Sequence, residues 1–367
     1  MTPPTLPCDV IIVGGGPAGC AAAIGLRQAN VSCALLERSR YDRPRFGESL
    51  PPAAKPLLRA LGVWDQFRSD GHLPSPGNLS VWGDPIPGET AFIADPHGPG
   101  WHVDRLRFDR MLFDAAARTA AAQEGVKAID CRRAAGGWAV TADGPRERLR
   151  YTAHFLVDAT GRRRPLAGLT TRSARIHDRL LAVVGTCGDA DTCHEDRRTW
   201  VEAVEDGWWY TAPVPGRRVV AAFMTDATVL RGQCGSLAGF LDRQLQQAGV
   251  TESRLSARSG WSNVTVLSAL SYLSSMVVGA DFLAVGDAAA AFDPLSSEGL
   301  CKALREGLLA ARTIGRHLHG DADALQDYAS DVRRGFSDFA RQHRWMYGLE
   351  RRWPSSDFWR RRHEGLQ

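Results

Sequence analysis

The stretch Asp9-Val-Ile-Ile-Val-Gly-Gly-Gly-Pro-Ala-Gly19 decides the fold. Val10 to Val13 are apolar and β-branched, which is typical of a buried parallel strand. Gly14, Gly16 and Gly19 then fill the G-x-G-x-x-G positions. The first glycine permits a tight turn, the second lets the backbone approach a pyrophosphate, and the third lets a helix pack on the strand. The stretch therefore predicts a dinucleotide-binding βαβ unit.

The residues that follow strengthen this prediction. Cys20 to Ala29 is Ala-rich and is predicted to be a helix whose N-terminus directs N–H groups at phosphates. A second strand, Ser32 to Leu36, ends at Glu37, an acidic residue at the spacing that binds ribose hydroxyls. The predicted cofactor-binding residues of this unit are Gly14, Gly16, Pro17, Ala18, Gly19, Glu37 and Arg38.

Two distant motifs favour FAD over NAD. Phe155 to Gly161 is an apolar run that ends in Asp-Ala-Thr-Gly, and Phe282 to Leu300 contains Gly-Asp and then Asp-Pro-x-x-Ser-x-Gly. A strand that ends in Gly-Asp puts a carboxylate at the sheet edge where ligands bind. The next turn opens another helix, whose N-terminus can stabilise an anionic flavin ring. These motifs add the candidates Asp158, Gly161, Gly286, Asp287, Pro294, Ser297, Gly299 and Leu300.

Together the three motifs resemble the FAD-dependent monooxygenases of the p-hydroxybenzoate hydroxylase fold, over about residues 9 to 315. The resemblance implies an α/β (α+β) fold: a Rossmann-like FAD domain interleaved with an antiparallel β-sheet substrate domain and a C-terminal helical tail. It implies that Glu37 binds the adenosine ribose, Asp158 lies near the pyrophosphate and Asp287 binds the ribityl chain. Arg105 matches an R-x-x-F-D element that contacts FAD, and Arg45 lies in the flavin loop. Either arginine is alternatively an ordinary surface charge.

The motif order predicts a discontinuous arrangement. We expect the FAD domain at 1–78, 100–176 and 276–320, a substrate sheet at 79–99 and 177–275, and a helical segment at 321–367. The 177–275 region alternates apolar and polar residues, which predicts antiparallel strands with one covered face. No second G-x-G-x-x-G unit exists, so electrons are expected from NAD(P)H bound transiently or from a separate flavin reductase.

Halogenases of this superfamily are one alternative for the chemistry. Gly47-Glu-Ser-Leu-Pro51 resembles their GESL element, and Trp208-Trp-Tyr-Thr-Ala-Pro213 is close to their W-x-W-x-I-P motif. Their chemistry needs a lysine amine, whereas residues 71–77 contain none. The three lysines of the chain are Lys55, Lys127 and Lys302. The sequence therefore disfavours halogenation.

The flavoprotein maturases of tryptophylquinone-containing amino-acid oxidases are the more similar relatives, through residues 75–83 and 350–359. This resemblance implies hydroxylation of a tryptophan or indole-like ring by a flavin C4a-hydroperoxide formed with O₂. The substrate is then an aromatic small molecule or a tryptophan-bearing partner, the oxidase precursor. The catalytic candidates are Glu48, His72, Trp208 and Tyr210, with His102, Trp82 and Trp209 beside them. Most of these aromatic and histidine side chains are alternatively structural.

Composition narrows the remaining classes. A net charge of +4 on 367 residues, without a nucleic-acid module, does not indicate DNA or RNA binding. The eight cysteines form no CxxC pair, so no metal site is predicted. No long apolar run or signal peptide is seen, so a cytoplasmic location without a transmembrane segment is expected. Two other hypotheses stay open: a hydroxylase, halogenase-like enzyme or reductase for a secondary metabolite, and a non-enzymatic FAD-binding protein.

Overall fold

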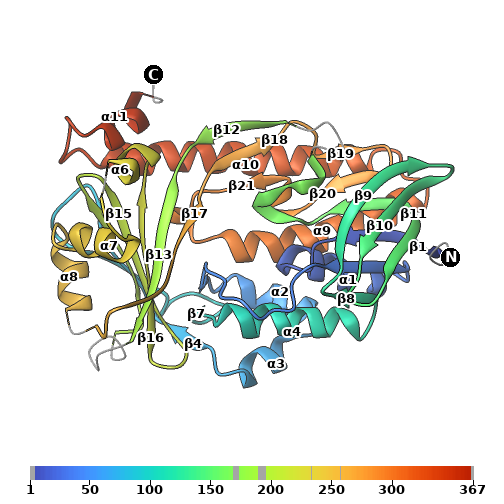
Figure 1. The fold of residues 1–367 in the computed structure, drawn as a ribbon, viewed down its shortest axis with the longest axis horizontal. Coiled ribbons are helices and arrows are strands. Elements are labelled where there is room, and N and C mark those ends of the chain that lie inside the picture. Colours follow the sequence, from blue (N-terminus) through green and yellow to red (C-terminus); the bar gives the residue numbers. More distant parts are fainter. Residues whose placement is uncertain (1–4, 168–172, 189–195, 233, 257, 365–367) are drawn as a thin grey trace.

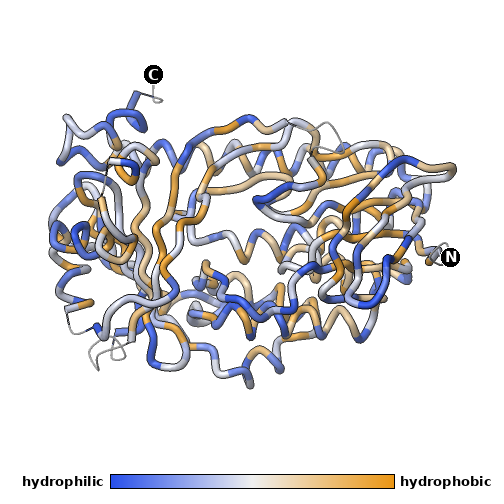
Figure 2. Tube along the Cα trace, viewed as in Figure 1, coloured by the Kyte–Doolittle hydropathy of each residue, from blue (hydrophilic) through white to orange (hydrophobic). Residues whose placement is uncertain are grey.

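The computed structural model describes the chain except residues 1–4, 168–172, 189–195, 233, 257 and 365–367. Two large sheets lie at opposite ends of an elongated molecule, and helices run between them (Figure 1). Apolar residues follow the strands of both sheets, while the outer helices alternate between polar and apolar residues (Figure 2). The predicted mixed α/β fold is confirmed.

The first sheet has eight strands and carries the decisive motif. Its central strands are parallel, in the order β8-β2-β1-β11-β20, and β9 and β10 extend β11 in antiparallel fashion. The strands are β1 (Thr5–Val13), β2 (Cys33–Glu37), β8 (Ala121–Glu124), β9 (Lys127–Ala134), β10 (Gly137–Asp143), β11 (Arg148–Asp158), β19 (Val278–Gly279) and β20 (Phe282–Ala284). Because β1, β11 and β20 are neighbours, the three distant motifs end at the same edge of one sheet.

Four long helices pack around this sheet. They are α1 (Pro17–Gln28), α4 (Arg105–Ala117), α9 (Gly299–Leu318) and α10 (Ala324–Leu349). Proline at the first turn fits the start of α1, because that position needs no N–H donor. α9 lies directly against α1: a Cβ added at Gly307 would come 2.5 Å from the carbonyl oxygen of Ala18. A glycine is therefore required for this close approach.

The second sheet has seven strands in the order β17-β13-β16-β15-β14-β5-β6. All neighbours are antiparallel except β14 and β5, which are parallel. The strands are β5 (Gly77–Val81), β6 (Gly88–Ala91), β13 (Leu181–Gly188), β14 (Thr199–Val204), β15 (Gly207–Val214), β16 (Arg218–Thr225) and β17 (Trp261–Ser268). β6 is an edge strand of this sheet and lies within the 79–99 segment that the sequence analysis assigns to the substrate sheet.

The expectation that this sheet has one covered face is wrong. All eight residues of β15 are buried, so both faces of the sheet are covered at its centre. One face packs on α7 (Leu237–Leu245) and α8 (Gly249–Leu255). The other face packs on the end of α10 and on α11 (Asp357–Glu364). The helical tail supplies the second cover, which a local alternation pattern does not reveal.

Smaller elements connect the two sheets. They are α2 (Ala54–Ala60), α3 (Trp64–Ser69), α6 (Ala227–Arg231), β3 (Ser49–Leu50), β4 (Leu73–Ser75), β7 (Gly100–His102), β12 (Ala174–Asp178), β18 (Ser271–Ser274) and β21 (Ala290–Ala291). β3, β7 and β4 form one three-stranded sheet, and β12, β18 and β21 form another. Among the described residues, no helix has the length and apolarity to cross a membrane. Seven cysteines are free thiols, and Cys193 lies outside the described residues.

Candidate functional site: a glycine-lined cradle and the polar groups beside it

Backbone geometry at the end of β1 forms an open cradle. A Cβ at Gly14 (φ +112°) would come 2.3 Å from the carbonyl oxygen of Ala159, so this turn requires glycine. In contrast, a Cβ at Gly16 or Gly161 would meet nothing within 4 Å. Backbone is therefore exposed to free space where the N-terminus of α1 meets the turn after β11. Such a space suits a pyrophosphate, which accepts N–H bonds and a favourable helix dipole.

Glu37 ends β2 beside this cradle. Its carboxylate accepts hydrogen bonds from the backbone N–H groups of Gly15 (2.6 Å) and Ser39 (2.8 Å). Tyr41 donates its hydroxyl to the Gly15 carbonyl oxygen at 2.6 Å. These bonds fix the carboxylate at the edge of the glycine turn, where the sequence predicted a ribose ligand.

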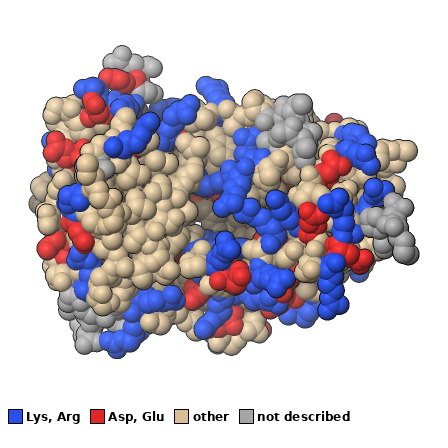
Figure 3. Space-filling model, viewed as in Figure 1, with Lys and Arg blue, Asp and Glu red and all other residues tan. Residues whose placement is uncertain are grey.

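Basic side chains surround the cradle. Burial and the nearby cations Arg163 and Arg45 lower the pKa of Arg38. Asp109 anchors two further guanidinium groups, those of Arg45 (2.7 Å) and Arg105 (3.1 Å). Figure 3 shows Lys and Arg side chains gathered beside a hollow between the two sheets. Clustered cations of this kind favour an anionic ligand, so these residues fit the diphosphate of a dinucleotide.

Ion pairs and a backbone hydrogen bond hold the Gly-Asp turn after β20. Arg162 forms an ion pair with Asp287 at 3.0 Å. The N–H of Gly286 donates to Glu306, which also pairs with the buried Lys302 at 3.0 Å. We did not predict this Lys302–Glu306 pair from the sequence, although its i, i+4 spacing on a helix is a signal that could have identified it. On the other side of the cradle, Asp158 is fully buried, and its carboxylate accepts from the N–H and hydroxyl of Thr160.

The turn before α9 is capped by a side chain and contains a residue in the left-handed region. Asp293 accepts a hydrogen bond from the N–H of Leu295, and this caps the short 3₁₀ turn Pro294–Ser296. Ser297 then adopts a left-handed conformation with φ +52°. A Cβ at Gly299 would meet nothing within 4 Å, so the N-terminus of α9 faces open space, while Leu300 anchors the turn in the core.

Glu48 is a buried carboxyl group of this region with a raised pKa. The side chain is buried, and this burial raises its pKa to about 7, although Arg105 opposes the shift. Its carboxylate accepts a hydrogen bond from the N–H of Gly47 at 3.0 Å. A carboxyl group that titrates near neutral pH can donate or accept a proton, which is the property of a general acid or base.

A chain of hydroxyl groups joins the Glu48 loop to the second sheet. Ser49 lies 2.9 Å from the hydroxyl of Tyr210 and 3.2 Å from that of Thr199, and Thr199 lies 2.8 Å from Nε2 of His102. Burial lowers the pKa of His102 to about 3, so its ring is neutral at physiological pH. The sequence could not identify Ser49 and Thr199, because their roles depend on contacts between distant strands.

His72 lies apart from this chain. Its ring packs against Phe67 and Phe108, and its Nδ1 accepts the N–H of Asp104 at 3.3 Å. Burial lowers its pKa to about 4. The structure therefore places a neutral, packed histidine at this position.

The candidate aromatic residues divide between the two faces of the second sheet. Trp208 is fully buried among Trp82, Tyr347 and other rings of the tail, and its Nε1 donates to the hydroxyl of Tyr347 at 2.9 Å. Trp209 points to the opposite face and packs on Phe223. Adjacent strand residues point to opposite faces, so Trp208 and Tyr210 share a face and Trp209 does not.

Within the part of the chain that the structure describes, two of the three lysine amines are engaged by other groups, and the third lies on an outer strand. Lys55 donates to the carbonyl oxygen of His97 and lies over the ring of Trp64. Lys302 is buried in its pair with Glu306. Lys127 begins the outer strand β9.

The glycine cradle, its basic rim and the Gly-Asp turn define a flavoprotein with a Rossmann-like FAD site. The chain belongs to the FAD binding domain family, whose model matches residues 7–341. It is an FAD-dependent oxidoreductase, and the resemblance to the FAD-dependent monooxygenase superfamily is confirmed.

Relatives of this chain include both oxidoreductases and halogenases. It is 27% identical to the FAD-dependent oxidoreductase LodB of Marinomonas mediterranea, over 97% of this chain and 96% of LodB. It is 26% identical to the flavin-dependent halogenase armH3 of Armillaria mellea, over 91% of this chain and 73% of the relative.

Solved structures show the same fold. The peptidyl tryptophan dihydroxylase QhpG, essential for tryptophylquinone cofactor biogenesis, is 27% identical with a TM-score of 0.78, over 97% of this chain and 78% of QhpG. The myxobacterial chondrochloren halogenase CndH has a TM-score of 0.90 at 24% identity, over 97% of this chain and 86% of CndH.

Proposed function

We propose that this protein is an FAD-dependent monooxygenase that hydroxylates an aromatic ring, and that its substrate is a tryptophan side chain of a partner oxidase precursor. The positions of the lysines carry this proposal. An amine near the substrate is what halogenase chemistry requires, and Lys55 and Lys302 are engaged elsewhere. Likeness to LodB along nearly the whole of both chains, and to the peptidyl tryptophan dihydroxylase QhpG, supports the choice of substrate.

Bound FAD, once reduced, would supply the activation of O₂. The residues of this chain would hold the cofactor through the glycine cradle, with Arg45 and Arg105 at its edge. The electrons would come from NAD(P)H or from a separate flavin reductase. We also propose that the discontinuous domain division and the cytoplasmic location predicted from the sequence apply.

Glu48 and Tyr210 have the chemistry to handle the proton of the reaction. Glu48 is buried with a pKa near 7, so it exists in both protonation states at neutral pH. Tyr210 is held by Ser49, and burial raises its pKa far above neutral, so its hydroxyl stays a donor. Hydroxylation of an electron-rich ring needs only positioning and steadying of charge, so a strong catalytic base is not required. Trp208 and His72 would contribute packing and would take no part in proton transfer.

A second candidate is modification of a small secondary metabolite. The likeness to fungal halogenases, which extends over about nine-tenths of this chain, favours it. The two candidates differ in what must enter the site: a free aromatic metabolite in one, and a tryptophan within a polypeptide in the other.

The test is a single-turnover reaction. The FAD-loaded protein is reduced, mixed with O₂ and offered either a tryptophan-containing peptide or free indole compounds, with and without bromide. We expect oxygen-bearing peptide products in mass spectrometry and no brominated product. Brominated products without hydroxylation would refute the proposal, and products from free indoles alone would favour the second candidate. Lys55→Met serves as a control variant that should leave hydroxylation unchanged.

A further inference from the structure

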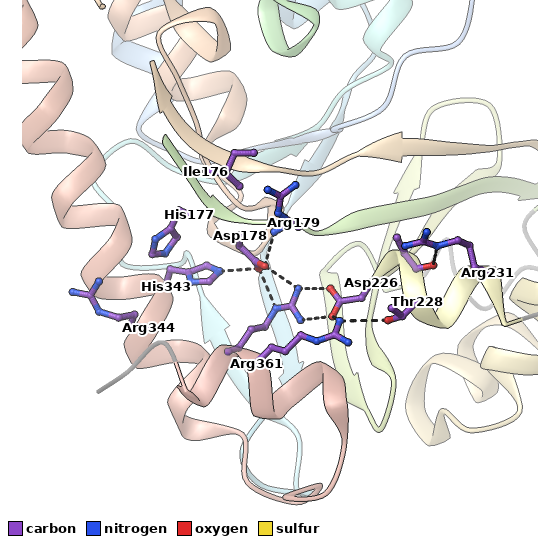
Figure 4. Close-up of a pocket in the computed structure, with 12 residues that line it drawn as sticks. Ile176, His177, Asp178, Arg179, Asp226, Thr228, Arg231, His343, Arg344 and Arg361 are labelled. Carbon is purple, nitrogen blue, oxygen red and sulfur yellow. Dashed lines mark hydrogen bonds and ion pairs between the residues drawn. The ribbon is translucent and has the colours of Figure 1, made fainter. Parts of the chain in front are cut away.

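The structure contains a cavity that shares no lining residue with the glycine cradle. It has a volume of about 500 Å³ and opens between β12, α6, α10 and α11. Five arginines contribute to its wall, and only two acidic residues do: Arg179, Arg231, Arg344, Arg361, Arg362, Asp178 and Asp226. These residues lie on β12, α6, α10 and α11 or directly beside them. Figure 4 shows Asp226, Thr228 and Arg361 turned toward one another. The cavity therefore has an excess of positive charge.

Two of the arginines already balance the two acids. Arg362 lies 3.0 Å from Asp178 and 2.9 Å from Asp226. Arg361 lies 2.9 Å from Asp226, and Figure 4 marks this ion pair with a dashed line. Arg362 is almost fully buried, so this ion-pair network forms a fixed part of the cavity wall rather than a mobile surface. His343 adds a further cation, because Asp178 and Asp293 raise its pKa to about 9.

The remaining three arginines are unmatched. Within the part of the chain that the structure describes, Arg179, Arg231 and Arg344 form no ion pair with a carboxylate. Arg231 donates to the carbonyl oxygen of Ala227, one turn earlier in its own helix. Guanidinium groups that share one cavity repel each other unless an anion lies between them. Arginine is also the side chain best suited to carboxylate and phosphate groups, which it binds through two parallel hydrogen bonds.

We propose that this cavity binds a ligand with two or more carboxylate or phosphate groups, held by Arg179, Arg231 and Arg344. The ligand class is a compact polyanion, either free or carried as acidic side chains on a polypeptide. The site is distinct from the FAD cradle and does not depend on the proposed hydroxylase function.

A bound cation is the competing assignment, and the local charges oppose it. Asp178, Asp293 and His343 offer ligand atoms within 4.8 Å of one another. However, the guanidinium of Arg362 already occupies the Asp178 carboxylate, and His343 carries a proton where a metal would need a lone pair. Arg362 and protonated His343 therefore already balance the negative charge of this cluster.

Binding is measured by calorimetry on the FAD-loaded protein, so that the glycine cradle is filled. The probes are inorganic pyrophosphate and a short peptide of glutamate residues. We expect at least one probe to bind, and Arg344→Ala and Arg231→Ala each to weaken its affinity about tenfold, as loss of a charge-assisted bond implies. The matched control is Arg341→Ala, on the same helix but paired with Asp338 outside the cavity.

Each outcome decides the proposal. Pyrophosphate binding alone assigns the site to a free polyanion, and peptide binding alone assigns it to an acidic segment of a partner; both support the proposal. Failure of both probes would overturn it. Equal loss in Arg341→Ala and Arg344→Ala would also overturn it, because the effect would then come from general surface charge. Circular dichroism establishes that each variant is folded.

Discussion

The ion pairs of His343 predict a stability that depends on pH. The ring lies 3.2 Å from Asp293 and 3.7 Å from Asp178, and it is 8% exposed. The two carboxylates raise its pKa to about 9, against an opposing effect of burial. The other titratable groups beside it include Arg362, which pairs with Asp178, and Tyr347, whose ring centroid lies 4.4 Å from that of His343. His177 also contacts it, and the pKa of His177 is lowered by burial and by the charge on His343.

The direction of this pH dependence follows from the linkage between protonation of His343 and folding. A group whose pKa is higher in the folded state stabilises the fold below its unfolded pKa, and this stabilisation is lost as pH rises through the folded value. The rise from 6.5 to about 9 corresponds to about 3 kcal/mol, at roughly 1.4 kcal/mol for each pKa unit. This contribution should be complete at pH 6 and nearly gone at pH 9.5.

The perturbation is His343→Gln, measured by urea unfolding of the FAD-loaded protein from pH 6 to 9.5. We expect the difference in unfolding free energy between wild type and variant to fall by about 3 kcal/mol across this range. His154→Gln, at an exposed histidine of β11, is the control and should show no such trend. A difference that stays level between pH 6 and 9.5 would refute the reasoning.

Three further substitutions test the glycine cradle, the Glu48 loop and the Tyr347 hydroxyl. Gly14→Ala would put a methyl group 2.3 Å from the carbonyl oxygen of Ala159, so the purified variant should lack FAD absorbance, and a yellow, stoichiometric flavoprotein would contradict this. Glu48→Gln should abolish an inflection near pH 7 in substrate-dependent O₂ uptake; an unchanged pH profile would assign the titration to another group. Tyr347→Phe removes the hydroxyl between Trp208 and Asp293, so urea unfolding should show a loss of about 2–4 kcal/mol, whereas a loss below about 0.5 kcal/mol would argue against this link.

The sequence predicted the glycine turn of the cradle because the conformation of such a turn depends on residues close together in the chain. The need for a left-handed φ at Gly14, the helix start at Pro17 and the acidic end of β2 are all fixed within about 30 residues. The two later motifs were also readable, because each is a strand followed by its own turn. Their common edge then follows from parallel neighbours in one sheet.

The sequence failed where distant segments meet. Ser49 and Tyr210 are 161 positions apart, yet their hydroxyls are 2.9 Å apart. The covered second face of the seven-stranded sheet depends on α11, more than 100 residues beyond the strand that it covers. Trp208 and Trp209 appear equivalent in the sequence, and only the pleat of β15 separates them.

The sequence by itself therefore determined the fold class and the family, and it predicted the glycine turn proposed to hold FAD, because backbone conformation and glycine spacing are local properties. The tertiary structure alone decided which titratable side chains have shifted pKa values and which distant side chains come into contact. Burial sets the pKa of Glu48, and ion pairs between separate elements set that of His343. The arginine-rich cavity arises in the same way, since its walls come from four elements that only the folded chain brings together.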